Sequence, residues 1–239
     1  MFNPVVAGIT ARATLGRKRA AILALPAVIL IALTLILRAS HPLALVWPDE
    51  VLGDFGFSIL LPLTALIIGT SVLGAEIDDG SVVHLLATPV RRADVIVTKF
   101  IVAAAFTALF AAVPELIAGL LAPNSTKLAF ALFVGALVGS VVYSAVFVFV
   151  SVLTSRAIAF GLLYVALWEG LLSNYVGGAR ILSVAHYALG VANAIHPDKN
   201  LNAGLSLGTS VTLAVIFTLG ALYLATRRLS AFSLAGDQA

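Results

Sequence analysis

Apolar residues fall into six long runs along this chain of 239 residues, and short polar stretches separate the runs. Each run has about the length that a helix needs to cross the hydrocarbon core of a bilayer, roughly 20 residues, although the first and fifth runs are slightly short. The runs are continuous rather than alternating, which favours helices over the strands of a membrane barrel. We therefore predict an all-α membrane protein, with one transmembrane domain over residues 1–239 and six transmembrane helices. The predicted spans are Ala20–Leu37, Phe55–Ala75, Phe100–Ala122, Leu128–Leu153, Ala157–Leu172 and Leu205–Ala225.

The composition supports a membrane setting. Hydrophobic residues make up 61% of the chain and charged residues 10%, with a mean hydropathy of +1.11. Soluble domains carry about 25% charged residues, so this composition excludes a soluble enzyme, a disordered chain and a free nucleic-acid-binding protein. The net charge of +3 gives no sign of a nucleic-acid partner. The absence of cysteine removes disulfides, thiolate metal sites and cysteine nucleophiles.

Basic residues are concentrated on one side of the predicted spans. Ten of the 14 Lys and Arg residues lie before the first span, in the loops after the second and fourth spans, and in the tail. Cytoplasmic loops carry an excess of Lys and Arg, so we predict that both termini are cytoplasmic in a multi-pass protein of the plasma (inner) membrane. The ten residues are Arg12, Arg17, Lys18, Arg19, Arg91, Arg92, Lys99, Arg156, Arg227 and Arg228.

Two segments outside the spans have helical patterns of their own. Met1–Arg19 has a weak apolar face among basic residues, which is typical of an interfacial helix under the inner leaflet; a disordered basic tail is the alternative. Ser173–Gly204, before the sixth span, has apolar residues at helical spacing from Ile181 to Ile195. We predict one or two short helices there that dip into the outer leaflet.

The cytoplasmic segment Glu76–Lys99, between the second and third spans, carries apolar residues that a solvated loop does not need. Ser81 can cap a short helix, and the acidic residues before it favour the positive end of that helix. Pro89 ends the helix, because the residue before a proline avoids helical backbone angles. Its apolar side chains need a partner, either the bilayer surface or another protein, whereas the alternative is an ordinary charged loop. These side chains are Val82, Val83, Leu85 and Leu86.

Several motifs for chemistry are absent from the sequence. The chain has no GxxxxGKS or GxxxxGKT phosphate loop, no HExxH and no G-x-S-x-G, and its four histidines lack the spacing of metal ligands. We therefore expect no catalytic residue, no cofactor and no metal site on this chain.

Two carboxylates lie inside predicted spans: Glu115, directly after Pro114, and Glu169, directly after Trp168. At 1.5 Å per residue, both fall in the outer half of the bilayer. A carboxylate within a membrane is costly and marks a functional site by default, so both residues are candidates for a substrate path. The alternative is that either one reaches interfacial water or caps the outer loop through its backbone N–H groups.

With the six-span topology in view, the motif in Glu76–Lys99 resembles that of type-2 ABC exporter permeases, the six-span membrane subunits of ABC transporters. The matching residues are Glu76, Gly80, Ser81, Leu85, Leu86, Pro89, Arg92 and Lys99, with Arg91 where the family often has serine. The resemblance implies a coupling helix that contacts a separate ATP-binding cassette ATPase through these residues and Val82. It also implies two ATPase copies, which bind ATP and Mg²⁺, and a second permease subunit, identical or different.

The function that this resemblance implies is transport by alternating access in an ATP-driven exporter, in which this chain is not itself an enzyme. The apolar helices suggest a hydrophobic or amphipathic substrate, such as a lipid, a peptide or a drug. A stand-alone channel or proton-coupled carrier that uses Glu115 and Glu169 is the alternative from another class. A membrane-embedded enzyme is a third hypothesis, and the missing nucleophiles and metal ligands disfavour it.

Overall fold

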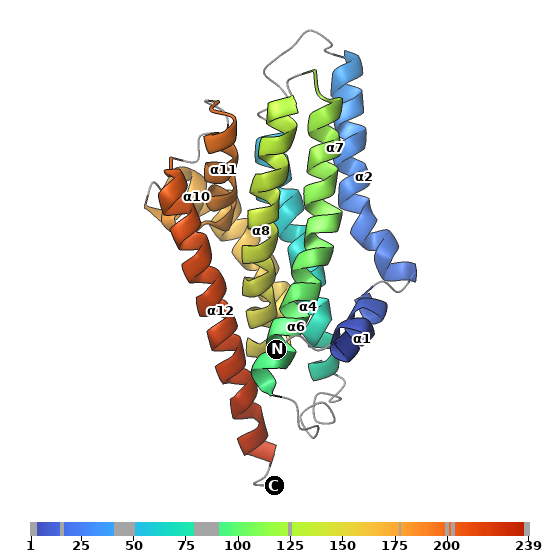
Figure 1. Cartoon of the computed structure of the whole chain (residues 1–239), viewed down its shortest axis with the longest axis vertical. Helices are drawn as coiled ribbons and strands as arrows, with labels where there is room; N and C mark the ends of the chain where they lie inside the picture. Colours follow the sequence, from blue (N-terminus) through green and yellow to red (C-terminus); the bar gives the residue numbers. More distant parts are fainter. Residues whose placement is uncertain are drawn as a thin grey trace.

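The structure, a computed structural model of the whole chain, describes residues 4–14, 17–40, 51–78, 91–123, 126–176, 178–198, 201 and 204–236. Apart from short turns, these residues are helical and include no strand (Figure 1). The elements, with π-helical and 3-10 segments marked η, are α1 (Pro4–Thr14), α2 (Arg17–Ser40), η1 (Val51–Leu60), α4 (Leu61–Asp78), α6 (Arg92–Thr107), η2 (Ala108–Ala112), α7 (Val113–Leu121), α8 (Thr126–Leu153), α9 (Ala157–Leu163), η3 (Tyr164–Leu172), α10 (Ser173–Tyr175), η4 (Ala179–Leu182), α11 (Val184–Ile195) and α12 (Leu207–Gly236).

Helix α8 forms the centre of the bundle. It packs against α4, α6, α7, α11 and α12. Its buried side chains, among them Leu132, Tyr143 and Phe147, join Phe57 and Leu61 in the largest apolar core. Helices α2 and α12 lie at the periphery, where most of their residues are exposed.

Gly135 of α8 lets α11 lie close against that helix. A β carbon at this position would lie 2.7 Å from the carbonyl oxygen of Ala188 and 3.1 Å from the β carbon of Ala192. Small residues at helix interfaces allow this kind of close backbone approach in membrane proteins. Helix α11 is consequently held between α8 and α12, with most of its residues buried.

Prolines inside two helices coincide with widened helical turns. The π-helical segment η1 ends two residues before Pro62, and η2 ends two residues before Pro114. Proline has no N–H, and its ring clashes with the carbonyl of the residue four positions earlier, so the preceding turn departs from regular α geometry. The two widened segments run into α4 and α7, which carry the next parts of the same spans.

Five helices are long and apolar enough to cross a membrane. They are Ala21–Ser40, Val51–Leu73, Arg92–Leu121, Thr126–Leu153 and Leu207–Ser230. Five of the six predicted apolar runs therefore lie on helices of spanning length. The remaining run, Ala157–Leu172, also forms a helix with the predicted bounds, α9 followed by η3, but it falls short of that length.

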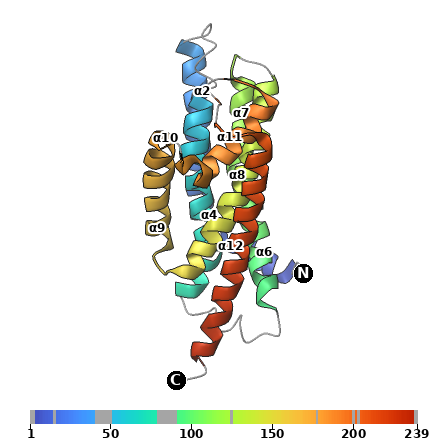
Figure 2. The same cartoon turned by 90° about the vertical axis from the view of Figure 1, so that its left-hand side faces the viewer.

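The chain nevertheless passes from one end of the bundle to the other between α8 and α12. Arg38 donates a 2.8 Å hydrogen bond to the carbonyl of Leu121, so the ends of α2 and α7 lie together, next to the start of α8. Arg92 donates bonds of 3.3 and 3.4 Å to the carbonyls of Leu229 and Ser230, which places the start of α6 beside the last part of α12 at the opposite end. Between them, α9, η3 and α11 rise in steps toward the end where α12 begins (Figure 2).

Helix α1 lies at the end of the bundle where α12 finishes, against α4 and α6 (Figure 1). The first and last helices therefore share one end, as the sequence predicts for termini on one side of a membrane. Which side that is stays a prediction. The same holds for the interfacial position of α1 and for the dipping of α10, η4 and α11, although helices do form in both predicted segments.

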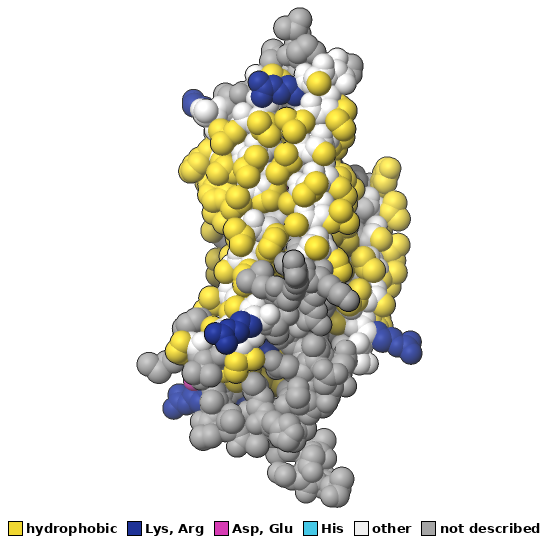
Figure 3. All heavy atoms as spheres, turned by 90° about the vertical axis from the view of Figure 1, so that its right-hand side faces the viewer, with side chains coloured by type: hydrophobic (Ala, Val, Ile, Leu, Met, Phe, Trp, Pro, Cys, Tyr) yellow, Lys and Arg dark blue, Asp and Glu magenta, His cyan; other side chains and the backbone are white. Residues whose placement is uncertain are grey.

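One face of the molecule is a broad apolar surface between two groups of basic side chains (Figure 3). Monomeric soluble proteins rarely expose apolar patches of more than a few hundred Å². Such a surface is suited to contact with the hydrocarbon of a bilayer. On α2 the exposed residues include Ile22, Leu25, Val28, Ile29 and Ile36.

Candidate functional site

Most of the segment predicted to contact an ATPase lies outside the described residues. Those members are Gly80, Ser81, Val82, Leu85, Leu86 and Pro89. Glu76 lies in α4, and its side chain is also outside what is described. The coupling helix and its contact with an ATPase therefore stay predictions. Arg91, Arg92 and Lys99 are described, and they occupy three different environments.

The two adjacent arginines lie at the start of α6. Arg91 directly precedes the helix and is exposed, so a partner could reach its guanidinium. Arg92 is half-buried, and its Nη1 lies within hydrogen-bonding distance of two carbonyls of α12, those of Leu229 and Ser230. Arg92 therefore joins two helices of this chain as well as lying near the predicted contact surface.

Lys99 is buried inside the bundle instead of facing a partner. Its ammonium nitrogen, Nζ, donates a 2.7 Å hydrogen bond to the backbone carbonyl of Val72. An ammonium group can be buried only where it is hydrogen-bonded, because desolvation otherwise disfavours it strongly. This bond connects α6 with α4, which differs from the surface contact that the family resemblance implies for Lys99.

Glu169 lies in η3 and is almost completely buried, at 1% exposure. Its Oε1 accepts a 3.0 Å hydrogen bond from the hydroxyl of Tyr164 and a 2.9 Å bond from the backbone N–H of Val184. Its Oε2 accepts a hydrogen bond from the hydroxyl of Ser183. Hydrogen bonds to a carboxylate are stronger than neutral ones, so these donors offset the cost of burying the group.

These bonds place the Glu169 carboxylate at the N-terminus of α11. Ser183 is the N-cap residue of that helix, and its Oγ accepts a 3.3 Å bond from the backbone N–H of His186. The first N–H groups of a helix lack partners within the helix, and an acidic group near them is stabilised. Glu169 thus caps a helix of the predicted outer loop, which is the structural alternative that the sequence left open.

The hydrogen bonds around Glu169 also include the imidazole of His186. Nδ1 of His186 lies 2.8 Å from Oγ of Ser183. The single hydroxyl hydrogen of Ser183 is used in the bond to Glu169, so Oγ can only accept from the ring. With Glu169 ionised, Nδ1 of His186 is the donor of this pair, and hydrogen bonds connect the imidazole to the carboxylate through Ser183.

Glu115 is fully buried, but neither of its carboxylate oxygens has a hydrogen-bond partner among the described residues. The residue follows Pro114 near the start of α7, and its carboxylate packs against Gly56 of η1. A β carbon at Gly56 would lie 1.8 Å from Oε1 of Glu115. The geometry therefore separates the two carboxylates: Glu169 has a visible hydrogen-bonded structural role, whereas Glu115 has none within the part described. A place for either residue on a substrate path stays a prediction.

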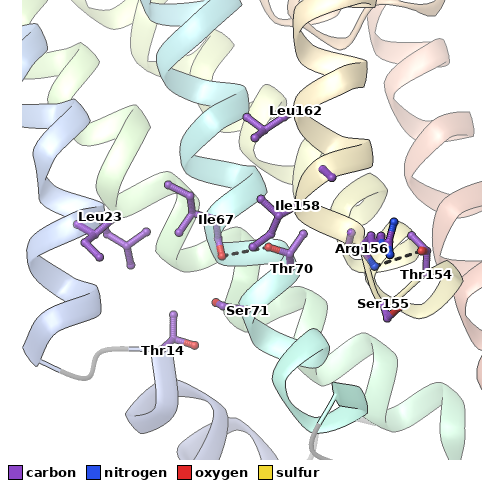
Figure 4. A pocket seen from close by; sticks show the side chains of 13 residues that line it. Thr14, Leu23, Ile67, Thr70, Ser71, Thr154, Ser155, Arg156, Ile158 and Leu162 are labelled. Atoms are coloured by element: carbon purple, nitrogen blue, oxygen red, sulfur yellow. Dashed lines mark hydrogen bonds between the residues drawn. The ribbon is translucent and has the colours of Figure 1, made fainter.

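A cavity of about 630 Å³ lies between α2, α4 and α9 (Figure 4). Its volume is within the range of roughly 300–1,000 Å³ that is typical of ligand pockets. Leu23 of α2 lies on one side of it and the turn from Thr154 to Arg156 on the other, with Ile67 and Ile158 between them. Sequence reasoning did not find this cavity, because its walls come from segments that are far apart along the chain.

Comparison with known proteins identifies a family. The sequence model of the family described as "ABC-2 family transporter protein" matches residues 15–178. No curated protein matches the chain. The matched region runs from the start of α2 to the end of α10, so it includes Glu115, Glu169 and the whole predicted coupling segment.

Proposed function

The chain belongs to the ABC-2 family of transporter proteins, and from this premise we propose that it is the membrane subunit of an ATP-driven exporter. The observation that carries the proposal is membership of this family in a chain that has no phosphate-binding loop in its sequence. Hydrolysis of ATP must then take place on another subunit. The apolar helices and the family together make this chain a multi-pass membrane protein and a permease.

In this proposal two copies of an ATP-binding cassette ATPase sit beneath a pair of permeases, which are identical or different. The ATPases hold ATP and Mg²⁺. The segment Glu76–Lys99 connects α4 with α6 and transmits the movement of the ATPases to these spans. The exposed position of Arg91 at the start of α6 supports a contact surface at this place.

The proposal includes six crossings of the plasma membrane with both termini in the cytoplasm. The length of Ala157–Leu172 leaves it as the weakest crossing, but the route of the chain supports a crossing in this region. Helix α8 begins beside Leu121, whereas α12 ends beside Arg92, so the chain must return along the bundle between them. Helices α9 and α11, with η3, supply that return in two pieces.

Transport would proceed by alternating access, in which the cavity between the two permeases opens in turn to each side. The substrate would be hydrophobic or amphipathic, since the surfaces that α2 and α12 offer to such a cavity are largely aliphatic. Glu115 is a candidate for the substrate path, because it is the buried carboxylate for which the described residues provide no hydrogen bond.

Co-purification tests the proposal. The tagged chain is extracted from its native membrane, and the proteins that remain bound are sequenced. We expect a chain with a phosphate-binding loop in a one-to-one ratio, whose ATPase rate changes when the permease is bound. Substitution of the phosphate-loop lysine in that chain should abolish hydrolysis but leave the complex intact.

The channel or carrier hypothesis predicts the opposite outcome. The chain would then purify without an ATPase, and liposomes that contain it alone would conduct ions or take up protons with no ATP present. The full burial of Glu115 is the observation that favours this second function. Proton flux through liposomes, compared between the wild-type chain and Glu115→Gln, would distinguish it.

A further inference from the structure

The cavity between α2, α4 and α9 has aliphatic walls that open toward the lipid-facing surface. Ile22 of α2 is 56% exposed and Ile158 of α9 is 58% exposed, and both line the cavity. Behind them Leu23 and Ala157 are almost fully buried and form part of its inner wall. An apolar chain could therefore enter from the hydrocarbon of the bilayer and pack between the two helices.

Hydrogen-bond donors are gathered at one end of this cavity, on the turn from Thr154 to Arg156 (Figure 4). The hydroxyls of Thr70 and Ser71, which also line it, donate to carbonyls of their own helix at 2.6 Å and 2.9 Å. The guanidinium of Arg156 has no partner among the described residues, and no Asp or Glu is among the described residues that line the cavity. This end is therefore positively charged, and the Arg156 guanidinium is the group there that is available to a ligand.

We propose that this cavity binds an anionic phospholipid, with an acyl chain between α2 and α9 and the phosphate at Arg156. A guanidinium offers a planar set of donors that matches phosphate oxygens. Basic pockets between membrane helices on the cytoplasmic side are suited to anionic headgroups. Thr14 of α1 lines the cavity as well, which places the cavity near the end of the bundle that α1 shares with the last part of α12, the predicted cytoplasmic end. The site does not depend on the proposed transport function.

Lipid binding to the full chain tests this proposal. The purified chain in a neutral detergent is titrated with phosphatidylglycerol, and bound lipid is counted by native mass spectrometry. Phosphatidylcholine tests the negative charge of the headgroup, and inorganic phosphate tests whether a free anion is sufficient. We expect phosphatidylglycerol to bind in preference to phosphatidylcholine and inorganic phosphate not to compete.

Two variants locate the site. Arg156→Gln should weaken phosphatidylglycerol binding by about five-fold or more, since one basic side chain near an anionic headgroup contributes about that factor. Ile158→Trp, at an exposed position on the wall of the cavity, should narrow the space between α2 and α9 and reduce binding of both lipids. Lys127→Gln removes a charge at the opposite end of the bundle and should change nothing.

Several outcomes would overturn the proposal. Equal binding of the two lipids would show that the site does not distinguish an anionic headgroup from a neutral one. Unchanged phosphatidylglycerol binding in both variants would show that the lipid binds elsewhere. Competition by inorganic phosphate would indicate a simple anion site. If Ile158→Trp instead dissociates a dimer and leaves lipid binding intact, the cavity is covered by a second copy of the chain.

Discussion

The carboxylate of Glu115 lies directly against Gly56, in space that a side chain at position 56 would occupy. A β carbon there would lie 1.8 Å from Oε1 and 2.7 Å from Cδ of the carboxyl group. Glycine at 56 is thus what lets a buried carboxylate fit between η1 and α7. The two residues come from different predicted spans, so their contact couples the position of the second span to that of the third.

Gly56→Ala should lower the thermal midpoint of unfolding in detergent, because overpacking of this kind commonly costs about 1–3 kcal/mol. The loss should be smaller when Glu115 is also replaced by Ala, since the obstructing carboxyl group is then gone. Contacting residues show coupling of about 0.5–3 kcal/mol in such double-mutant cycles. Gly220→Ala on α12 is the control, because a β carbon there meets nothing within 4 Å. Additive effects of Gly56→Ala and Glu115→Ala would contradict the contact.

Glu169→Gln should destabilise the protein more than Glu115→Gln does. Glutamine at 169 loses the charge that caps α11 and one of the acceptor oxygens that Tyr164, Ser183 and Val184 use. Losing hydrogen bonds to a buried charged group costs about 1.5–3 kcal/mol. Glu115→Gln breaks no hydrogen bond that the structure shows, so its unfolding midpoint should remain close to that of the parent.

Transport measurements on Glu115→Gln separate a role in transport from an effect on stability. If Glu115 lines the substrate path, Glu115→Gln should reduce transport in a complex that assembles and hydrolyses ATP normally. Normal transport by this variant would show that the Glu115 carboxylate is not needed on the substrate path.

Lys99→Ala should lower the unfolding midpoint strongly, because it removes the hydrogen bond to the carbonyl of Val72 and leaves a cavity between α4 and α6. Large-to-small substitutions in cores cost about 2–5 kcal/mol. Lys99→Met keeps most of the volume and should be milder. Arg91→Ala is the matched control at an exposed position of the same region. A stable Lys99→Ala variant that has lost its ATPase would instead support the surface role that the resemblance implies.

The apolar pattern predicted an all-helical fold with six spans, because bilayer thickness sets a length that can be counted along the sequence. The described residues are helical, and five of the six predicted spans lie on helices of spanning length. The pattern could not show that the chain crosses the bundle between α8 and α12 in two shorter helical pieces. Ala157–Leu172 and the stretch that becomes α11 are both apolar, but each is short. Their arrangement depends on packing against α8, for example at Gly135 and Ala188, and that packing depends on which helix faces meet.

The environments of the candidate residues could not be predicted from the sequence either. Glu115 and Glu169 look alike in sequence, each next to a bulky or rigid residue inside an apolar run. Their environments differ because Ser183 and Val184, which are distant from Glu115, fold back onto Glu169. Lys99 follows an exposed and a half-buried arginine along the chain, yet it is buried because it lies about two helical turns farther into α6, where its ammonium group meets the Val72 carbonyl of α4.

Labelling of introduced cysteines tests the orientation. Lys127 and Arg91 are exposed at opposite ends of the bundle, and the chain has no native cysteine to mask. With cytoplasmic termini, Lys127→Cys should react with a membrane-impermeant thiol reagent in intact cells, and Arg91→Cys should react only after the cells are opened. The reverse pattern would invert the topology.

The central claim, that this permease is driven by a separate ATPase through Glu76–Lys99, is tested most directly by Leu85→Ala combined with Leu86→Ala. Apolar residues at the centre of an interface often contribute about 2 kcal/mol or more each. The double variant should therefore insert and pair normally but lose the co-purifying ATPase, or leave its hydrolysis unresponsive to substrate. Arg91→Ala, at the charged rim, should weaken the complex less, and its effect should shrink at high salt. Full ATPase recovery with normal substrate-stimulated hydrolysis in the double leucine variant would contradict the claim.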